Sequence, residues 1–590
     1  MKEIEMSCES HLEYFRESFI KDEEWAVKLL DSWQKFSSKP LISNLLNFGP
    51  FTDCLNFQQN LNSSEIQGQH CLISYSSILS HNFDDTSNEY EIDSIIEKET
   101  FVLKNGICLP SSCSMSEIEN FLRNHLKETD IIVLNSYCQT KEKLSINVLD
   151  IFVLFTFIAL ILITSICTYF DLKYRGKKFN NKFLKAFSAY ENFKCLSKYA
   201  INERSIECVN GLKVLSAIWI IIGHRMDMIS ENSNVIREFM SSEERLILRI
   251  SEMFTSVVDT FFLISGLLVA VKCLRLFKEH NFSFIKHCTA RFLRFFPVLA
   301  IIIAFFMSTW PKKLANGPQT IEFKEELEDC KKNWLRSLLL VGNFNSNFCL
   351  RHTWYTSTDF QLFIISPAIV YGLFKFKRKF LKIIAFIIVV GQINIFVHKL
   401  SDIHEEFYYE AYYRFMPWFI GIMLGYNLES KQDAKGIDQN LKALGWTASI
   451  ISLTLIEFIR FQEKSKFSEA LYEATHRIIW SNAFAWIIYA CHHNKSSGFL
   501  MNFLSHRIWN SLARMCLSIY LVHYLVVMLS FVNMKNPYQF DVLWLLKILL
   551  LDIFMSLIIS FIFYMLVEAP MCRIVKTFER KNYYVLVENR

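Results

Sequence analysis

The stretch NGLKVLSAIWIIIGHRMD, residues 210–227, combines an apolar middle with an ionisable side chain near each end. Lys213 lies near its start, and His224 follows eleven residues later. Eleven residues of α-helix cover about 16 Å and about three turns, so both side chains lie on roughly one face. An ionisable face on a membrane-spanning helix usually points into the protein, toward a cavity or a partner. The alternative is that Lys213 extends to the lipid headgroups and His224 lies at the membrane interface.

The composition indicates a membrane protein around this stretch. The chain has 590 residues, of which 52% are hydrophobic and 15% aromatic. Apolar runs such as IFVLFTFIALILIT (151–164) and LLKILLLDIFMSLIISFIFYMLV (545–567) approach or exceed the roughly 18–20 residues that cross a bilayer. The formal net charge of +5 is small and dispersed, which argues against nucleic acid as a partner.

About eleven candidate spans follow one another after residue 146. They lie near residues 147–170, 209–229, 254–274, 293–310, 354–374, 380–398, 413–428, 441–459, 476–491, 511–533 and 543–567. The pattern predicts an all-α polytopic membrane protein of about eleven transmembrane helices, preceded by an N-terminal cysteine-rich extracytoplasmic domain.

The loops predict the orientation of these spans. Basic segments follow alternate spans, for example YRGKKFNNKFLK (174–185) and FKFKRKFLK (374–382). Lys and Arg accumulate in cytosolic loops, so the first 146 residues are expected outside the cytosol and the C-terminus inside it. Both the plasma membrane and the endoplasmic reticulum fit this orientation.

These boundaries divide the chain into five predicted parts. They are the cysteine-rich domain (1–146), the first transmembrane helix (147–170), a cytosolic basic linker (171–208), the membrane domain (209–575) and a cytosolic tail (576–590). Residues 1–20 lack the apolar core of a signal peptide. Either the first span acts as the signal, or the true start lies upstream, and we favour the second explanation.

The cysteine-rich domain holds six cysteines, which suit a disulfide framework in an oxidising compartment. They are Cys8, Cys54, Cys71, Cys108, Cys113 and Cys138. Their spacing does not reveal the pairing, and free thiols in a cytosolic domain are the alternative. Cys330 and Cys349 share one predicted outer loop and are candidates for a further disulfide. His and Cys do not form paired short-spaced clusters, so no metal site is predicted.

Three glycosylation sequons test the orientation. Asn62 lies in the exported domain and is expected to be modified, which makes the protein a glycoprotein. Asn281 and Asn494 fall on the predicted cytosolic side and should remain unmodified.

Asp259 lies in SVVDTFFLISGLLVA (256–270), which enters the membrane from the predicted outer side. We therefore expect Asp259 at about the depth of His224. An imidazole beside a carboxylate makes an oriented general base. A structural salt bridge between Asp259 and Arg225 is the competing interpretation. Ser265, further along, offers a small side chain where a helix or a ligand can approach closely, and packing is the commoner use.

Arg291 and Arg294 in ARFLRFFP (290–297) precede the fourth predicted span. Their spacing places two guanidinium groups on one helical face, which suits phosphate binding. The alternative is that they serve only as the positive-inside signal. Cations toward the cytosol and a His–Asp pair toward the outside suit a phosphorylated donor whose reactive end reaches an acceptor on the far side.

Several segments in series resemble the integral-membrane acyltransferases of the acyltransferase-3 family. They are CVNGLKVLSAIWIIIGHRMD, VVDTFFLISGLLVA, ARFLRFFPVL, WYTSTDFQLFIISP, YYRFMPWFIGIMLGY, SIYLVHYLV and VEAPMCRIVK. The front of the chain resembles the domain of the nose-resistant-to-fluoxetine subgroup of invertebrates. The segments concerned are EEWAVKLLDSWQKFSSKPLISNLLNFGPFTDCL, HCLIS and NGICLPSSCS. Together they cover nearly the whole chain.

The resemblance implies acyl transfer from acyl-CoA to a hydroxyl on a lipid, a sugar or another small acceptor. By this analogy His224 is the essential histidine, and Lys213 replaces the family arginine eleven residues earlier. Lysine keeps the charge but lacks the planar fork of arginine. The remaining matches are Arg291 and Arg294 as the basic pair, Asp259, Ser265 and Glu568 at family positions, and Tyr520 and His523 in a matching late helix.

The expected mechanism has Arg291, Arg294 and Lys213 holding the nucleotide phosphates at the cytosolic mouth. His224, oriented by Asp259, removes the proton of the acceptor hydroxyl as it attacks the thioester. The main alternative is a lipid or drug transport or uptake protein that keeps the fold without the chemistry. The lysine at position 213 favours it slightly. A receptor-like use of the exported domain is a third possibility.

Overall fold

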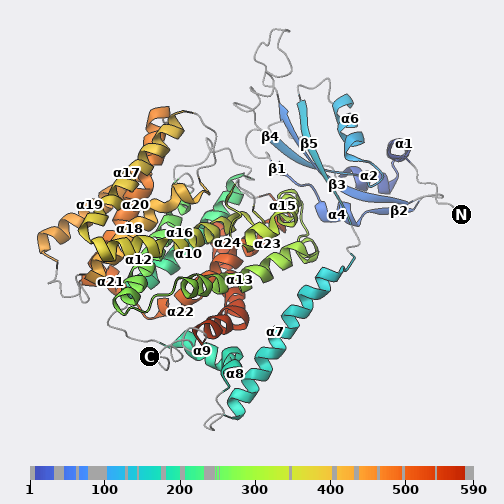
Figure 1. Cartoon of the computed structure of the whole chain (residues 1–590). Coiled ribbons are helices and arrows are strands. Elements are labelled where there is room, and N and C mark those ends of the chain that lie inside the picture. The colour runs from blue at the N-terminus through green and yellow to red at the C-terminus, as the bar shows by residue number, and fades with distance from the viewer. Residues whose placement is uncertain are drawn as a thin grey trace.

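The computed structural model divides the chain into a mixed α/β domain and a larger helical part (Figure 1). It describes residues 7–31, 46–60, 65–77, 102–125, 131–141, 145–174, 181–198, 206–231, 246–247, 249–251, 253–344, 348–401, 408–430, 437–460, 465–493, 498–537 and 541–577. The helical part agrees with the predicted fold class. The sheet in the N-terminal domain is a feature that the cysteine count did not predict.

The N-terminal domain is built around one long strand, β3. Its strands are β1 (Leu46–Asn47), β2 (Gln58–Asn60), β3 (Glu65–Ser77), β4 (Val102–Pro110) and β5 (Ile131–Thr140). β4 pairs antiparallel with β3 and parallel with β1, whereas β2 and β5 pair antiparallel with successive parts of β3. The helices of this domain are α1 (Cys8–Ile20), α2 (Glu24–Asp31), α4 (Phe51–Asn56) and α6 (Met115–His125).

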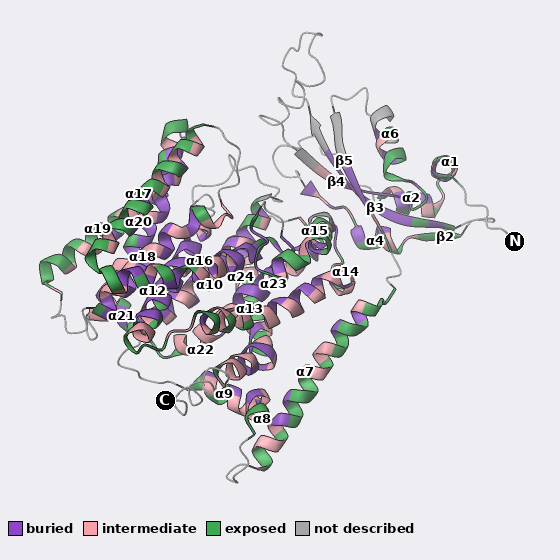
Figure 2. Ribbon diagram, in the orientation of Figure 1, coloured by how far each residue is buried: buried purple, intermediate pink, exposed green. Residues whose placement is uncertain are grey.

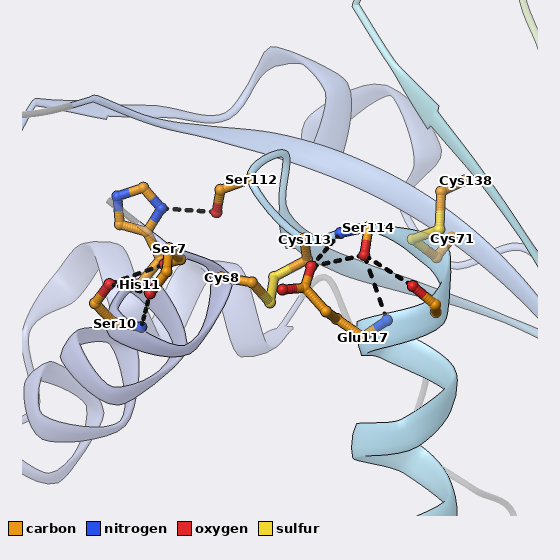
Figure 3. The surroundings of a disulfide bond; sticks show 11 residues. Ser7, Cys8, Ser10, His11, Cys71, Ser112, Cys113, Ser114, Glu117 and Cys138 are labelled. Carbon is orange, nitrogen blue, oxygen red and sulfur yellow. Dashed lines mark hydrogen bonds between the residues drawn. A yellow bond between two sulfur atoms is a disulfide. The ribbon is translucent and has the colours of Figure 1, made fainter. Parts of the chain in front are cut away.

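All six cysteines of this domain form disulfides, as predicted. The pairs are Cys8–Cys113, Cys54–Cys108 and Cys71–Cys138. The first ties α1 to the turn before α6, where Ser114 and Glu117 cap the helix (Figure 3). The third joins directly opposed residues of β3 and β5. The predicted Cys330–Cys349 bond also forms, whereas Asn62 lies outside the described residues.

The second part is a bundle of long helices with short helices at the connections (Figure 1). Its elements are α7 (Val148–Lys173), α8 (Lys182–Phe187), α9 (Ala189–Ser197), α10 (Cys208–Glu231), α12 (Phe254–Lys278), α13 (Phe284–Met307), α14 (Trp310–Leu314), α15 (Thr320–Leu338), η3 (Arg351–Thr353), α16 (Trp354–Phe376), α17 (Arg378–Leu400), α18 (Ala411–Ser430), α19 (Gln439–Arg460), α20 (Lys466–His493), α21 (Phe499–Leu504), α22 (Ile508–Arg514), α23 (Cys516–Val532), α24 (Val542–Phe563) and η4 (Tyr564–Glu568).

A helix forms at each of the eleven places where the sequence predicts a span. Within the described residues, seven helices are long and apolar enough to cross a membrane, or eight if the bent pair α22–α23 is one span. Helices α10, α18 and α20 are not among them. Each carries a buried arginine, namely Arg225, Arg414 and Arg477, and such groups lower the hydropathy of a helix. The predicted number of spans is therefore supported only in part.

The helix that contains the fourth predicted span begins before that span. Helix α13 begins at Phe284, so Arg291 and Arg294 lie inside the helix rather than before it. The basic segment at its start is helical because residues such as Lys and Arg favour a helix as well as apolar residues do. Both arginines can therefore reach partners within the bundle.

Helix α12 is the centre of the bundle, and most of its residues are buried (Figure 2). It packs closely against α18 through glycines. A Cβ at Gly266 would lie 2.2 Å from the carbonyl oxygen of Trp418, and one at Gly421 would lie 2.0 Å from that of Leu263. The close approach of α12 and α18 fits the packing interpretation of the Ser265–Gly266 pair.

Helix α7 lies at the edge of the bundle and exposes long apolar stretches (Figure 2). Its start is held by Asp150, which accepts hydrogen bonds from the Thr309 backbone and side chain at 2.6 Å each. The N-terminal domain contacts α15 and the loop before it. Tyr137 Oη lies 3.2 Å from Thr320 Oγ1, and Gln139 Nε2 donates to the Pro318 carbonyl at 3.1 Å.

Candidate functional site

Three histidines from separate parts of the chain meet in the bundle. His224 comes from α10, His352 from η3 and His523 from α23, and we call them the imidazole cluster. The ring centroids of His224 and His523 are 5.4 Å apart, and those of His352 and His523 are 5.7 Å apart. Tyr524 completes the group, with its ring edge on His224 at 5.3 Å and its face stacked on His352 at 4.7 Å.

The cluster contains a ring nitrogen that can take a proton. His523 is buried, and its Nδ1 lies 3.2 Å from the Ile519 carbonyl oxygen, so Nδ1 carries the hydrogen of that bond. Its Nε2 is then an acceptor, and this atom is buried without a hydrogen-bond partner in the part of the chain that the structure describes. The sequence placed His523 in a matching segment, and the structure brings it to His224.

The expected partnership between His224 and Asp259 was wrong. The carboxylate of Asp259 accepts from Arg414 Nη1 at 3.0 Å. The residue of α12 that contacts His224 is Phe254, with ring centroids 5.1 Å apart. Asp259 lies five residues further along the helix, about 7.5 Å deeper. The sequence correctly predicted that this carboxylate faces the protein interior. It was wrong about the depth, because Asp259 lies about one and a half helical turns beyond the level of His224.

The competing pairing of Asp259 with Arg225 was also wrong. Arg225 Nε donates to Asp552 of α24 at 2.6 Å, and Arg225 Nη2 donates to the second oxygen at 2.9 Å. Both side chains are fully buried. A bidentate ion pair of this kind fixes α10 against α24, and the Asp552 carboxylate neutralises the charge of Arg225. His224 and Arg225 therefore point to different neighbours.

A second polar group, the cation cluster, consists of Lys213, Arg291 and Arg294. Arg291 Nη2 donates to Asp359 at 2.5 Å and to Ser265 Oγ at 3.1 Å. The guanidinium of Arg291 also lies over two phenylalanine rings, which orient it. Ser265 thus has a polar role in addition to its place beside Gly266.

Arg294 and Lys213 complete the cation cluster. Arg294 Nη2 donates to Glu568 at 3.3 Å, and Ser518 Oγ donates to the other oxygen of Glu568 at 2.7 Å. Glu568 ends a π-helical turn, a feature often found at functional sites. Lys213 interacts electrostatically with both arginines, and no ion pair at contact distance is formed by its ammonium within the described chain.

Two tyrosines connect the clusters. Tyr355 Oη donates to Asp359 at 3.3 Å, and its ring lies 5.2 Å from that of Tyr520. Tyr520 in turn donates to the carbonyl oxygen of His352, and its ring lies 5.7 Å from that of His523. Asp359 follows His352 by seven residues, which is about 10 Å along a helix. Polar groups therefore run from one cluster to the other through an apolar bundle.

Several residues of these clusters were not predicted from the sequence. They are His352, Tyr355, Asp359 and Tyr524, together with Glu326 of α15, whose carboxylate accepts from Tyr524 at 3.1 Å. A signal was present in RHTWYTSTDF (351–360), because polar side chains within an apolar helix usually face the protein interior. No group of three or more His, Cys, Asp or Glu suited to a metal ion occurs among the residues described.

Two family matches cover the two parts of the chain. The family described as acyltransferase domain matches residues 206–565, and the N-terminal domain of the nose resistant-to-fluoxetine protein matches residues 8–122. Over a 644-residue alignment, the chain is 23% identical to nose resistant to fluoxetine protein 6 of Caenorhabditis elegans. That alignment covers 93% of this chain and 78% of the relative. No solved structure matches the chain.

Proposed function

Because the chain belongs to the acyltransferase-3 family, whose domain spans residues 206–565, we propose that it transfers an acyl group from acyl-CoA to a hydroxyl acceptor. The acceptor is a membrane lipid, a sugar or another small molecule. The protein lies in the plasma membrane or the endoplasmic reticulum, with its disulfide-linked domain outside the cytosol and its C-terminus inside. The disulfides support the outward placement, since such bonds persist in oxidising compartments.

One observation carries the proposal: a cation cluster and an imidazole cluster lie in one apolar bundle and are connected by Tyr355 and Tyr520. A donor that joins a phosphate-rich nucleotide to a thioester needs positive charge at one end and a base at the other. Lys213 precedes His224 by eleven residues, or about 16 Å of helix. An extended pantetheine arm suits that separation.

In the proposed complex, the positive charge of the cation cluster binds the phosphates of acyl-CoA. Arg291 and Arg294 each already have a carboxylate partner, which leaves the ammonium of Lys213 as the cation best able to meet an added phosphate. A point charge of this kind binds phosphate without the bidentate geometry of arginine. The cluster has three cations and two carboxylates, Asp359 and Glu568, so it keeps a net positive charge.

The base is His224, with Tyr524 and His523 rather than Asp259 as its neighbours. In the proposed step, the acceptor hydroxyl gives its proton to His224 while its oxygen attacks the thioester carbonyl. A carbon–oxygen bond forms, the carbon–sulfur bond breaks, and the thiolate of coenzyme A receives the proton from His224. No acyl-enzyme is needed.

The test uses the purified full chain in lipid nanodiscs with acetyl-CoA and palmitoyl-CoA as probes. Release of the coenzyme A thiol, with water as the acceptor, is measured for the wild type and for His224→Ala. His506→Ala, an exposed histidine between α21 and α22, is the matched control. We expect thiol release to be lost in His224→Ala and unchanged in the control. Normal release without the imidazole of His224 would refute the proposal.

A second function, lipid or drug transport on the same fold without catalysis, has two observations in its favour. Both arginines of the cation cluster are already paired with carboxylates, and the family arginine is replaced by Lys213. Uptake of labelled phospholipid or fluoxetine into proteoliposomes distinguishes the two functions. Uptake that persists in His224→Ala, together with no thiol release by the wild type, would select transport.

A further inference from the structure

Helix α15 contacts α23, the helix that carries His523, and its sequence is amphipathic rather than apolar. Its sequence TIEFKEELEDCKKNWLRSL buries Phe323, Leu327 and Cys330 at helical spacing. Glu326 lies beside this buried stripe and is only partly exposed, whereas Glu325 and Glu328 are exposed. A carboxylate turned toward a protein interior needs a partner there.

Glu326 finds two partners on two different elements. Tyr524 Oη of α23 donates to one carboxylate oxygen at 3.1 Å, and the backbone N–H of Arg351 donates to the other at 3.1 Å. The ring of Tyr524 contacts both His224 and His352. Glu326 therefore holds the side chain that packs between two histidines of the cluster.

The position of α15 is itself held firmly. The Cys330–Cys349 disulfide joins it to the segment just before η3, and the Cys349 backbone N–H donates to Ser337 Oγ at 2.8 Å. Together with the bond from Arg351 to Glu326, these links attach α15 to the segment that carries His352. Glu326 thus approaches the cluster from a rigid support, as a positioning group requires.

We infer that Glu326 is a positioning residue for the imidazole cluster: it fixes Tyr524, and Tyr524 fixes the rings of His224 and His352. The inference rests on the proposed acyl transfer. A small misplacement of a base from its substrate costs up to roughly 100-fold in rate. Contacts that hold His224 in one orientation therefore have a large effect on the rate. The nucleotide end of the donor lies at the cation cluster, and its binding is unaffected.

The charge state of Glu326 gives the inference a pH signature. Burial raises the pKa of the Glu326 carboxyl to about 7, and nearby Asp329 acts in the same direction. Arg351 and the hydrogen bond from Tyr524 oppose this shift in pKa. Asp227 of α10 is the further charged group near Tyr524. The carboxylate that accepts from Tyr524 is thus present above about pH 7 and is lost as the pH falls below it.

The experiment compares three variants of the full chain in nanodiscs, again with acetyl-CoA and palmitoyl-CoA as probes. Glu326→Gln removes the ionisation, Tyr524→Phe removes one oxygen, and Glu328→Gln is the matched control on the same helix. We expect the first two to lower kcat by roughly 10- to 100-fold with an unchanged KM for the acyl-CoA. Glu328→Gln should behave as the wild type.

The pH profile separates positioning from a structural role. The fall in kcat below about pH 7 should disappear in Glu326→Gln and return in Glu326→Asp, which restores a carboxylate. The double variant Glu326→Gln with Tyr524→Phe should be no worse than either single variant, because both break one link. Should Glu326→Gln fail to fold, Tyr524→Phe tests the same link with a smaller change.

The outcomes are distinct for the two proposals. A wild-type kcat and pH profile in Glu326→Gln, with His224→Ala inactive, would overturn this inference alone. A Tyr524→Phe variant that keeps the wild-type kcat and the wild-type fall in kcat below about pH 7 would also overturn it. Thiol release that survives in His224→Ala, or that is absent from the wild type, would overturn the proposed function itself.

Discussion

Replacing Asp259 with asparagine should destabilise the protein rather than remove a catalytic partner of His224. Asp259 and Arg414 are both fully buried and form an ion pair at 3.0 Å. Breaking such a pair from one side costs roughly 3–5 kcal/mol, because the remaining charge is left without compensation. The cost should fall at the lower end of that range. Arg414 keeps its bond to the Tyr408 carbonyl at 2.9 Å and its position over the Tyr408 ring.

Thermal unfolding of the purified protein in detergent measures this effect. Asp259→Asn should lower the melting temperature markedly, while Asp259→Leu combined with Arg414→Met should recover most of the loss, since an apolar pair replaces both charges. The matched control is Asp438→Asn, at the exposed start of α19. The pH profile of thiol release should keep its wild-type shape in whatever fraction of Asp259→Asn remains folded. A variant with wild-type stability and the pH profile of a disabled base would refute the pairing and restore the His224–Asp259 dyad.

Three further results are expected. Replacing Cys330 and Cys349 together by serine should cost roughly 3 kcal/mol of folding stability, because their disulfide closes a loop of 19 residues, and chemical unfolding with non-reducing electrophoresis checks it. Asn62→Gln should remove a mass that peptide N-glycosidase also removes, whereas Asn281→Gln should leave the electrophoretic mobility unchanged; a shift in the second variant would contradict the orientation. Lys213→Ala should raise the KM for acyl-CoA about tenfold with little change in kcat, and Lys213→Arg should not; an unaffected KM in the alanine variant would exclude Lys213 from donor binding.

Much of the local structure was predictable, because it depends on properties that residues carry with them. Long apolar runs predicted helices at eleven places, and a helix forms at every one of them. The helix at this place begins at Phe284, before the apolar run that marked the span, because helix formation continues through the basic segment. The bend of 69° between α22 and α23 likewise divided a span that the sequence showed as continuous.

The cysteines show that the presence of disulfides is easier to predict from sequence than their pairing. The number of cysteines in residues 1–146 predicted a disulfide framework there, and a shared loop suggested the pair Cys330 and Cys349. The other pairings depend on the fold of the domain, and Cys71 and Cys138, for example, come together only when β3 and β5 are in register. The spacing of the cysteines along the chain does not predict the register of these two strands.

Hydropathy and cysteine content were enough to predict a helical chain with membrane-spanning helices and a disulfide-linked domain. They also marked His224, Lys213 and the two arginines as ionisable groups with a possible place inside the bundle. The partners of these groups became known from the packed helices. Asp259 forms an ion pair with Arg414, and Arg225 forms one with Asp552. The ring of His224 contacts those of His523 and Tyr524. The physical reason is that a partner depends on the depth and rotation of two helices, and packing sets both. An error of one turn, about 5.4 Å, is enough to exchange one partner for another.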